Sequence, residues 1–344
     1  MASPDFKPLL KQVLNSHGLT SEQQPRRVGI ELEFAGLEGE QIVKIVHDHF
    51  NGNVDTASPF EIFIRDTEYG DFRIELDSKA IKKIGEESSR TSNDSGDFSE
   101  RQFSELQDDL IDTIGSAAST LVPWEIVAPP IPLGDLHKLF PMIDKLREAG
   151  ALGTKHSIVY AFGVHLNPEL PNLEASTIVN YLKSFMCVYD YIRETEKTDI
   201  ARRITPYINH FDSSYQSLVL APDYQPNMDQ LIDDYLQHNP TRNRSLDMLP
   251  LFKEIDKQRV LAAIDDDRIN ARPTLHYRLP NCEIDDPEWN LDQSLEGWMR
   301  VEILAHNSEL RDVCDEFLAL GNRVLPSTVS QWTKRVEQLT QPSS

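Results

Sequence analysis

The 344-residue chain contains few cysteines and no long apolar run. Cys187, Cys282 and Cys314 are odd in number, widely separated and fit no zinc or disulfide motif, so we expect free thiols in a reducing cytoplasm. No apolar stretch reaches the roughly 18 residues that a membrane-spanning helix needs, and the first residues contain no signal-peptide core. We therefore predict a cytoplasmic protein without a membrane partner.

Positive charge is also scarce, because 34 Lys and Arg residues face 56 Asp and Glu residues, which gives a formal charge of −22. Binding to DNA or RNA relies on clustered Lys and Arg side chains at the phosphates, so we expect no nucleic-acid polymer as a partner. A single nucleotide can still be bound through a metal ion and a few arginines. The sequence contains no G-x-x-x-x-G-K-[ST] motif, which excludes a P-loop.

The segment Val28–Phe34 alternates apolar and polar residues, so a strand here places Glu31 and Glu33 together on its polar face. The two carboxylates are then about 7 Å apart and repel by about 2 kcal/mol at an effective dielectric constant of about 20. A divalent cation with oxygen ligands would relieve this repulsion. An edge strand with one solvated face shows the same pattern, so this segment alone does not decide between the two interpretations.

Several other predicted strands also combine an apolar face with a polar one. A solvated antiparallel sheet shows this alternation too, but its outer face is usually rich in Lys, Ser, Thr and Gln. Here the polar faces carry carboxylates, imidazoles and guanidinium groups, which favours a metal-dependent site. The strands and their polar residues are 72–77 with Arg73, Glu75 and Asp77, 124–128 with Glu125, 156–166 with His165 and the following Asn167, and 273–279 with His276 and Arg278.

Helical spacing of apolar residues predicts helices between and after these strands. Because hairpins and helices of varied length join the strands, we expect an α+β fold with a largely antiparallel sheet. We divide the chain into a lead-in (1–25) and one catalytic domain (26–344), with a polar mobile loop at 86–99 and a helical insertion at 174–264. The predicted helices cover about 40–50, 103–118, 141–149, 174–197, 227–238, 252–264, 292–306, 308–321 and 327–338.

Five ordered motifs resemble those of the amidoligase family, which are carboxylate–amine ligases of the glutamine synthetase and glutamate–cysteine ligase superfamily. The resemblance spans about residues 26–320 and implies an antiparallel sheet bent into a funnel, with helices on its outer face and ATP with Mg²⁺ or Mn²⁺ inside. The motifs are Gly29–Phe34, Asp77–Ser78, Glu125–Pro130, Gly163–Asn167 and Leu275–Arg278.

The resemblance also implies roles for individual residues. It makes Glu31, Glu33, Asp77, Glu125 and His165 metal ligands, with Glu125 also catalytic, and it places His165 and Arg278 at the ATP phosphates, where Arg278 faces the transferring phosphoryl group. Glu75 and Asn167 fall at positions suited to substrate. At position 276 the superfamily often has a glutamate ligand. Imidazole is a poor Mg²⁺ ligand, so the number and identity of the metals stay open, and His276 can instead contact only a substrate.

Four arginines are interpreted from their surroundings alone. Arg272, at the head of the last strand, is a candidate for ATP phosphate, and Arg203, after the long helix, for a substrate carboxylate, although the helix dipole also favours a cation there. Arg242 and Arg244 in the segment Asn239–Pro250 are interpreted as a loop brace in preference to an anion clamp. The acidic run Asp265–Asp267, near Arg268, is interpreted as a solvated turn in preference to a metal site.

The chemistry that the resemblance implies has two steps. The γ-phosphoryl group of ATP passes to a substrate carboxylate, and an amine then displaces phosphate from the acyl phosphate to leave an amide. The substrates are a small-molecule or peptide carboxylate and an amine, and the oligomeric state stays open. One alternative is phosphoryl transfer to a guanidino group on the same fold. Another is a non-catalytic relative that binds metal or nucleotide, which His276 gives reason to consider.

Overall fold

The computed structural model describes residues 6–76, 123–154, 162–196, 209–266, 268–321 and 326–342. Its centre is a nine-stranded sheet in the order β2-β3-β4-β5-β1-β7-β9-β8, with β6 also paired to β1, and its strand pairs are antiparallel. The strands are β1 (Arg27–Phe34), β2 (Asn53–Ser58), β3 (Glu61–Thr67), β4 (Gly70–Leu76), β5 (Trp124–Val127), β6 (Ile131–Pro132), β7 (Val164–Pro168), β8 (Leu246–Asp247) and β9 (His276–Tyr277).

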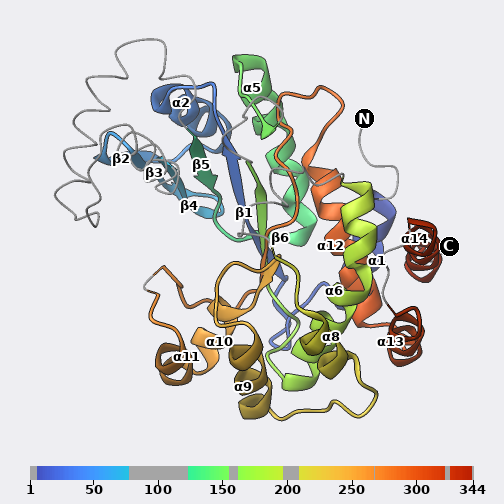
Figure 1. Ribbon diagram of the computed structural model, residues 1–344. Coiled ribbons are helices and arrows are strands. Elements are labelled where there is room, and N and C mark those ends of the chain that lie inside the picture. The colour runs from blue at the N-terminus through green and yellow to red at the C-terminus, as the bar shows by residue number, and fades with distance from the viewer. Residues whose placement is uncertain are drawn as a thin grey trace, which may run out of the picture.

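Helices surround this sheet, and Figure 1 shows α2 and α5 above it, with α9, α10 and α11 grouped below. The predicted α+β class is confirmed. No described helix is long and apolar enough to cross a membrane. The helices are α1 (Phe6–His17), α2 (Gly39–Phe50), the 3₁₀ helix η2 (Leu133–Leu139), α5 (Phe140–Ala149), α6 (Ala175–Thr195), α8 (Ser213–Leu220), α9 (Met228–His238), α10 (Leu249–Ile255), α11 (Lys257–Ala263), α12 (Leu291–Ala305), α13 (Leu310–Ala319) and α14 (Pro326–Leu339).

The apolar face of the sheet is covered by helices, as its alternation requires. Helix α2 contacts β3 and β4, where Phe50 stacks on Phe72 with ring centroids 4.6 Å apart. Toward the β8 edge of the sheet, Tyr277 of β9 packs against Phe185 of α6 and Trp298 of α12. Because neighbouring residues of a strand point to opposite faces, packing Tyr277 inward directs the residues on either side of it to the polar face.

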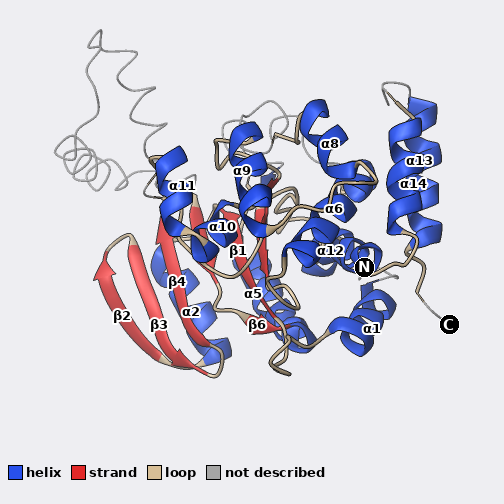
Figure 2. Ribbon diagram, turned by 90° about the horizontal axis from the view of Figure 1, so that it is seen from below, coloured by secondary structure: helices blue, strands red, loops and turns tan. Residues whose placement is uncertain are grey.

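Strand β1 lies in the interior of the sheet, paired with β5 on one side and β7 on the other (Figure 2). Its apolar set, Val28 to Phe34 in steps of two, is at most 1% exposed. An ion pair anchors the start of this strand to the helical layer, since Arg26 donates to Glu302 of α12 through two bonds of 2.7 and 2.9 Å. Both side chains are buried, and the hydroxyl of Tyr181 also donates to Glu302.

Some predicted elements differ from the observed ones. The predicted helix 252–264 is two helices, α10 and α11, because Asp256 leaves the helical conformation and its side chain accepts from the backbone N–H of Arg259 as the cap of α11. The exposed edge strand β2 has no apolar alternation and was not predicted. The segment 174–264 also contains β8, so it is not purely helical. The predicted loop 86–99 and helix 103–118 lie outside the described residues.

Candidate functional site

The polar face of β1 forms the middle of a row of ionisable side chains. Glu31 is the direct partner of His165 on β7, and His165 Nδ1 lies 3.0 Å from Oε2 of Glu31. The other carboxylate oxygen of Glu31 accepts a 2.8 Å hydrogen bond from the side-chain amide of Asn167. Although burial raises the pKa of Glu31, its electrostatic interaction with His276 and the hydrogen bond from His165 lower it well below its ordinary value. Glu31 is therefore ionised and held in place by two donors.

A second row of side chains, which starts two residues further along β1, consists of carboxylates. Glu33 pairs with Glu125 of β5, and Glu125 pairs with Glu75 of β4. Glu33 is buried and accepts a 2.8 Å hydrogen bond from the backbone N–H of Gly163. Burial raises the pKa of Glu75, and the opposing charge of Arg73 does not cancel the shift. Glu75 also hydrogen-bonds Glu125, which requires a proton on one of the two carboxyl groups.

The two rows meet at His165. Burial lowers the pKa of His165, so the ring is neutral at pH 7 and has one lone pair. Donation from Nδ1–H to the carboxylate of Glu31 places that lone pair on Nε2, which lies 3.8 Å from Oε1 of Glu33. Two groups of residues each have possible ligand atoms that lie within 4.8 Å of one another. The first group is Glu31, His165 and His276, and the second is Glu33, Glu125 and His165.

His276 is fixed by a network that leads back to Glu31. Its Nδ1 lies 2.6 Å from Oδ1 of Asn167, and Arg272 donates to the same oxygen at 2.7 Å. Burial lowers the pKa of His276 well below its usual value, and the charge of Arg278 adds to this shift. A neutral ring that donates from Nδ1 to Asn167 keeps its lone pair on Nε2. An imidazole at this position can thus replace a carboxylate as a ligand.

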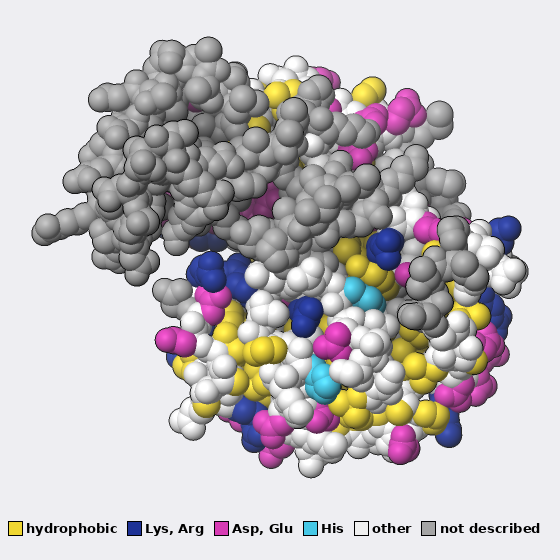
Figure 3. Space-filling view, viewed as in Figure 1, with side chains coloured by type: hydrophobic (Ala, Val, Ile, Leu, Met, Phe, Trp, Pro, Cys, Tyr) yellow, Lys and Arg dark blue, Asp and Glu magenta, His cyan; other side chains and the backbone are white. Residues whose placement is uncertain are grey.

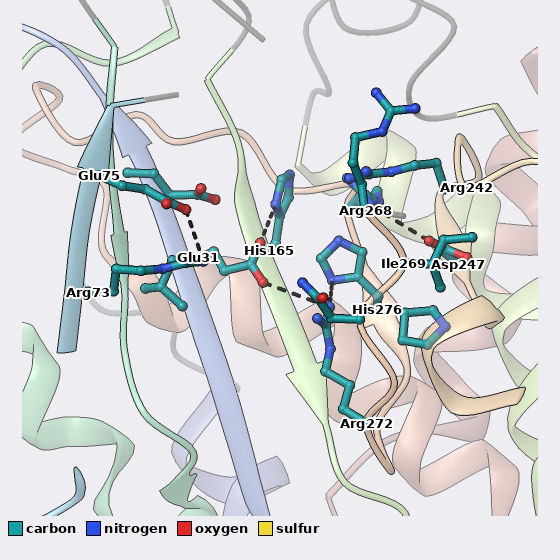
Figure 4. Close-up of a pocket in the computed structure, with 15 residues that line it drawn as sticks. Glu31, Arg73, Glu75, His165, Arg242, Asp247, Arg268, Ile269, Arg272 and His276 are labelled. Atoms are coloured by element: carbon teal, nitrogen blue, oxygen red, sulfur yellow. Dashed lines mark hydrogen bonds and ion pairs between the residues drawn. The ribbon is translucent and has the colours of Figure 1, made fainter. Parts of the chain in front are cut away.

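Glu31, Glu75, Glu125, His165 and His276 line a cavity of about 330 Å³ whose wall also contains several arginines (Figure 4). Figure 3 shows a small group of basic side chains on the surface above α11, near the outer part of this region. Buried Asp247 pairs with Arg278 at 3.7 Å. Burial raises the pKa of Asp247 to about 6, against the opposing charge of Arg278. The arginines of the cavity wall are Arg73, Arg242, Arg268, Arg272 and Arg278.

The structure brings most of the predicted site residues together on one face. Asp77 and Arg203 lie outside the described residues, so their predicted roles stay predictions. The residues that meet on this face are Glu31, Glu33, Glu75, Glu125, His165, Asn167, Arg272, His276 and Arg278.

Two arginines outside the predicted strands also line the cavity, and one acidic residue of the cavity wall was not predicted. Arg242 and Arg268 line the cavity, because the segments that carry them fold over the polar face of the sheet. Arg244 does brace the loop, donating to the backbone carbonyls of His210 and His238. Asp247 was not predicted, and its only signal in the sequence is its position between two apolar residues, Leu246 and Met248.

A family model described as "Putative amidoligase enzyme" matches residues 24–300. No curated protein matches the chain.

Proposed function

Because the chain belongs to the amidoligase family, we propose that it is an ATP- and divalent-metal-dependent ligase that joins a carboxylate to an amine. The observation that carries this proposal is that carboxylates and both imidazoles of the sheet line the same cavity as five arginines. Carboxylates and imidazoles suit a divalent cation, and arginines suit the phosphate groups of a nucleotide. A face with carboxylates and imidazoles alone would fit a metal ion without a nucleotide, and a face with arginines alone would fit an anion.

The donor set fits a divalent metal ion. Because Nδ1–H of His165 donates to Glu31, His165 can bind an ion only through Nε2. This favours the set Glu33, Glu125 and His165 for one ion. Glu31 and His276 remain close enough to hold a second ion. A bound ion would neutralise charge that develops on phosphate oxygens. The two imidazoles favour Mn²⁺ over Mg²⁺ at this site.

The arginines divide into an inner and an outer group. Arg278 is buried in the same cavity wall as the proposed metal ligands, so we expect it to contact the phosphoryl group in transfer. These proposed ligands, called the ligand set below, are Glu31, Glu33, Glu125, His165 and His276. Arg268 is 61% exposed at the rim, where it can contact the outer phosphates of the nucleotide. Phosphoryl transfer needs positioning and charge neutralisation more than covalent catalysis by the protein. Fixed guanidinium groups in a partly closed cavity supply both.

The proposed reaction balances in two steps. A carboxylate oxygen of the substrate bonds to the γ-phosphorus of ATP as the bond to ADP breaks, giving an acyl phosphate. The amine nitrogen then attacks the acyl carbon, loses a proton, and phosphate leaves with the oxygen that came from the carboxylate. The products are an amide, ADP and inorganic phosphate.

The fate of that oxygen tests the proposal directly. The protein is incubated with ATP, Mg²⁺ or Mn²⁺, an amine, and pooled carboxylates labelled with ¹⁸O. We expect ADP, an amide, and ¹⁸O in the released phosphate. A phosphorylated guanidino product without free phosphate would replace the ligase with a phosphotransferase. Thermal stabilisation by ATP without turnover of any pool would indicate a non-catalytic binding protein.

A further inference from the structure

A second cavity, of about 640 Å³, continues the first along the polar face of the sheet. The two cavities share Glu31, Val127 and Arg272 in their walls. The second one then follows β1 past Gly29 to Arg27, away from the arginine-lined cavity. A molecule in it therefore has one end at the ligand set and the other end near the surface.

The wall of the second cavity combines apolar and charged residues. Glu169 lies beside Arg27, to which it is hydrogen-bonded, and Glu22 also lines the cavity. In the part of the chain that the structure describes, neither Glu22 nor Glu169 forms an ion pair, although Glu169 accepts a hydrogen bond from the backbone N–H of Arg27. Two carboxylates against the single guanidinium of Arg27 leave a net negative charge at this end, which favours a cation. The apolar part consists of Pro25, Val127, Ala128, Leu170, Pro171 and Leu173.

Arg272 lies where the cavities meet. One of its nitrogens donates to Asn167 at 2.7 Å, which fixes the guanidinium, and its side chain is still 31% exposed. An arginine that is held at one side and open at the other is suited to bind a carboxylate. A carboxylate here would lie next to Glu31 and the ligand set, within reach of a nucleotide in the arginine-lined cavity.

Size and charge together point to one class of occupant. From Glu31 to Arg27 the strand advances four residues, or about 13 Å, which is the length of about four residues of extended peptide. The volume is that of cavities that enclose drug-sized ligands, so it exceeds the need of a single amino acid.

Building on the proposed function, we propose that this cavity binds a short peptide with free termini. Its C-terminal carboxylate, the acid to be activated, lies at Arg272, its apolar side chains contact the proline- and leucine-lined wall, and its N-terminal ammonium lies at Glu22 and Glu169.

Calorimetric titration with the tetrapeptide Ala-Leu-Leu-Ala tests this proposal without turnover. We expect the free peptide to bind, and both the N-acetylated peptide and the C-terminal amide to bind at least about tenfold more weakly, because each loses one charged contact. Replacing Glu22 and Glu169 together with Gln should remove the preference for the free over the acetylated peptide. Equal affinity of the wild-type protein for the free and acetylated peptides would overturn the proposal.

Gly29 offers a matched pair of variants on the floor of the cavity. A Cβ at this position would meet Asn167 Cβ at 3.4 Å, an ordinary contact, so Gly29→Ala should bind the peptide nearly as the wild type does. Gly29→Leu extends into the cavity and should weaken peptide binding at least about tenfold, with ATP affinity unchanged. Peptide binding by Gly29→Leu at wild-type affinity would place the peptide elsewhere. Melting curves establish that both variants fold.

This proposal and the ligase proposal can fail separately. If Ala-Leu-Leu-Ala binds as expected but neither it nor any pooled carboxylate gives an amide with ATP and amines, the ligase proposal fails and the peptide site stands. If the protein ligates single amino acids, and Gly29→Leu does not change the KM for them, the ligase proposal stands and the peptide site fails.

Discussion

The imidazole of His165 and the carboxylate of Glu31 are 3.0 Å apart and belong to residues that face each other directly across β1 and β7. Backbone pairing of the two strands therefore sets this contact, and the carboxylate selects the tautomer of the ring. A carboxylate that orients a histidine in this way raises the affinity of the histidine for a metal ion. Glu31 would thus orient His165 for one of the proposed ions and could itself contact the other.

Changing Glu31 to Gln should weaken metal binding and activity without unfolding the protein. An amide can accept from Asn167 with its oxygen, but its NH₂ group then faces Nδ1–H of His165 and favours the other tautomer. We expect Mn²⁺ affinity to fall by about 10–100-fold, with the melting temperature changed by only a few degrees. Titration with Mn²⁺ measures the first and a melting curve the second. Glu61→Gln, on an outer strand of the same face, is the control, and equal Mn²⁺ affinity of both variants would contradict the role of Glu31.

Replacing His276 with Glu should change the metal preference. The imidazole favours Mn²⁺, and a carboxylate favours Mg²⁺. We expect the ratio of Mg²⁺-supported to Mn²⁺-supported turnover to rise by about tenfold or more, or about 1.4 kcal/mol in relative stabilisation. His276→Gln, which has no negative charge, should lower turnover with both metals. If His276→Glu kept the wild-type ratio, His276 would not be a ligand.

Arg278 and Arg268 should affect different kinetic constants. Arg278 is buried beside the ligand set and is placed to act on the phosphoryl group in transfer, so Arg278→Ala should lower kcat by about 100-fold or more, with a smaller effect on the KM for ATP. Arg268 lies at the rim, so Arg268→Ala should mainly raise the KM for ATP. Steady-state kinetics with ATP varied distinguish the two. A pure KM effect of Arg278→Ala would remove its proposed role in transfer.

The buried ion pair of Arg26 and Glu302 should matter for stability and not for chemistry. Glu302→Gln leaves Arg26 buried with a neutral partner, so we expect the free energy of unfolding to fall by about 3–5 kcal/mol. Glu316→Gln breaks an exposed pair with Arg335 on neighbouring helices and should cost at most about 1 kcal/mol. Urea denaturation at pH 7 measures both values. Similar losses in the two variants would mean that the buried pair adds no more than a surface pair.

Acid should destabilise the protein partly through His306. Burial lowers the pKa of His306 to about 4, and the neighbouring His17 ring, stacked on it with centroids 3.4 Å apart, adds to the shift. Between pH 4 and pH 6.5 the unfolded chain binds a proton that the folded chain does not, so stability falls as the pH decreases through this range. For this group the loss is at most about 3 kcal/mol, less what solvent screens at the partly exposed ring.

Urea denaturation at pH 7.5 and pH 4.5 measures this effect. His306→Gln has no titrating ring and should lose less stability than the wild type over the same range. A change of pH that reduced the stability of both proteins equally would assign the acid sensitivity to other groups.

The polar face could be predicted because alternation along a strand does not depend on its partners. Glu31, His165 and Arg278 all follow from a period of two in segments whose other face is apolar. The resemblance to a family then supplied the order of the motifs, and the family match agrees with it. The same rule failed at β2, whose residues are nearly all exposed and show no contrast between faces.

Other parts of the site depend on contacts that no local pattern records. Arg242 and Arg268 reach the cavity because the loops that carry them fold back over the sheet, and loops have no periodicity from which a direction can be inferred. Arg26 and Glu302 are 276 positions apart, so neither residue identifies the other in the sequence. A single Asp between apolar neighbours, as at Asp247, occurs in many solvated turns.

The ligand set and the walls around it come from different kinds of structure. Glu31, Glu125 and His165 are carried by three neighbouring strands, whereas much of the wall of the second cavity comes from the connecting segments 20–25, 169–173 and 272–274. Substitutions in such segments leave the backbone pairing of the strands intact. Exchanging a few residues of these segments can therefore change which molecule the second cavity accepts while the carboxylates and imidazoles of the strands keep their positions.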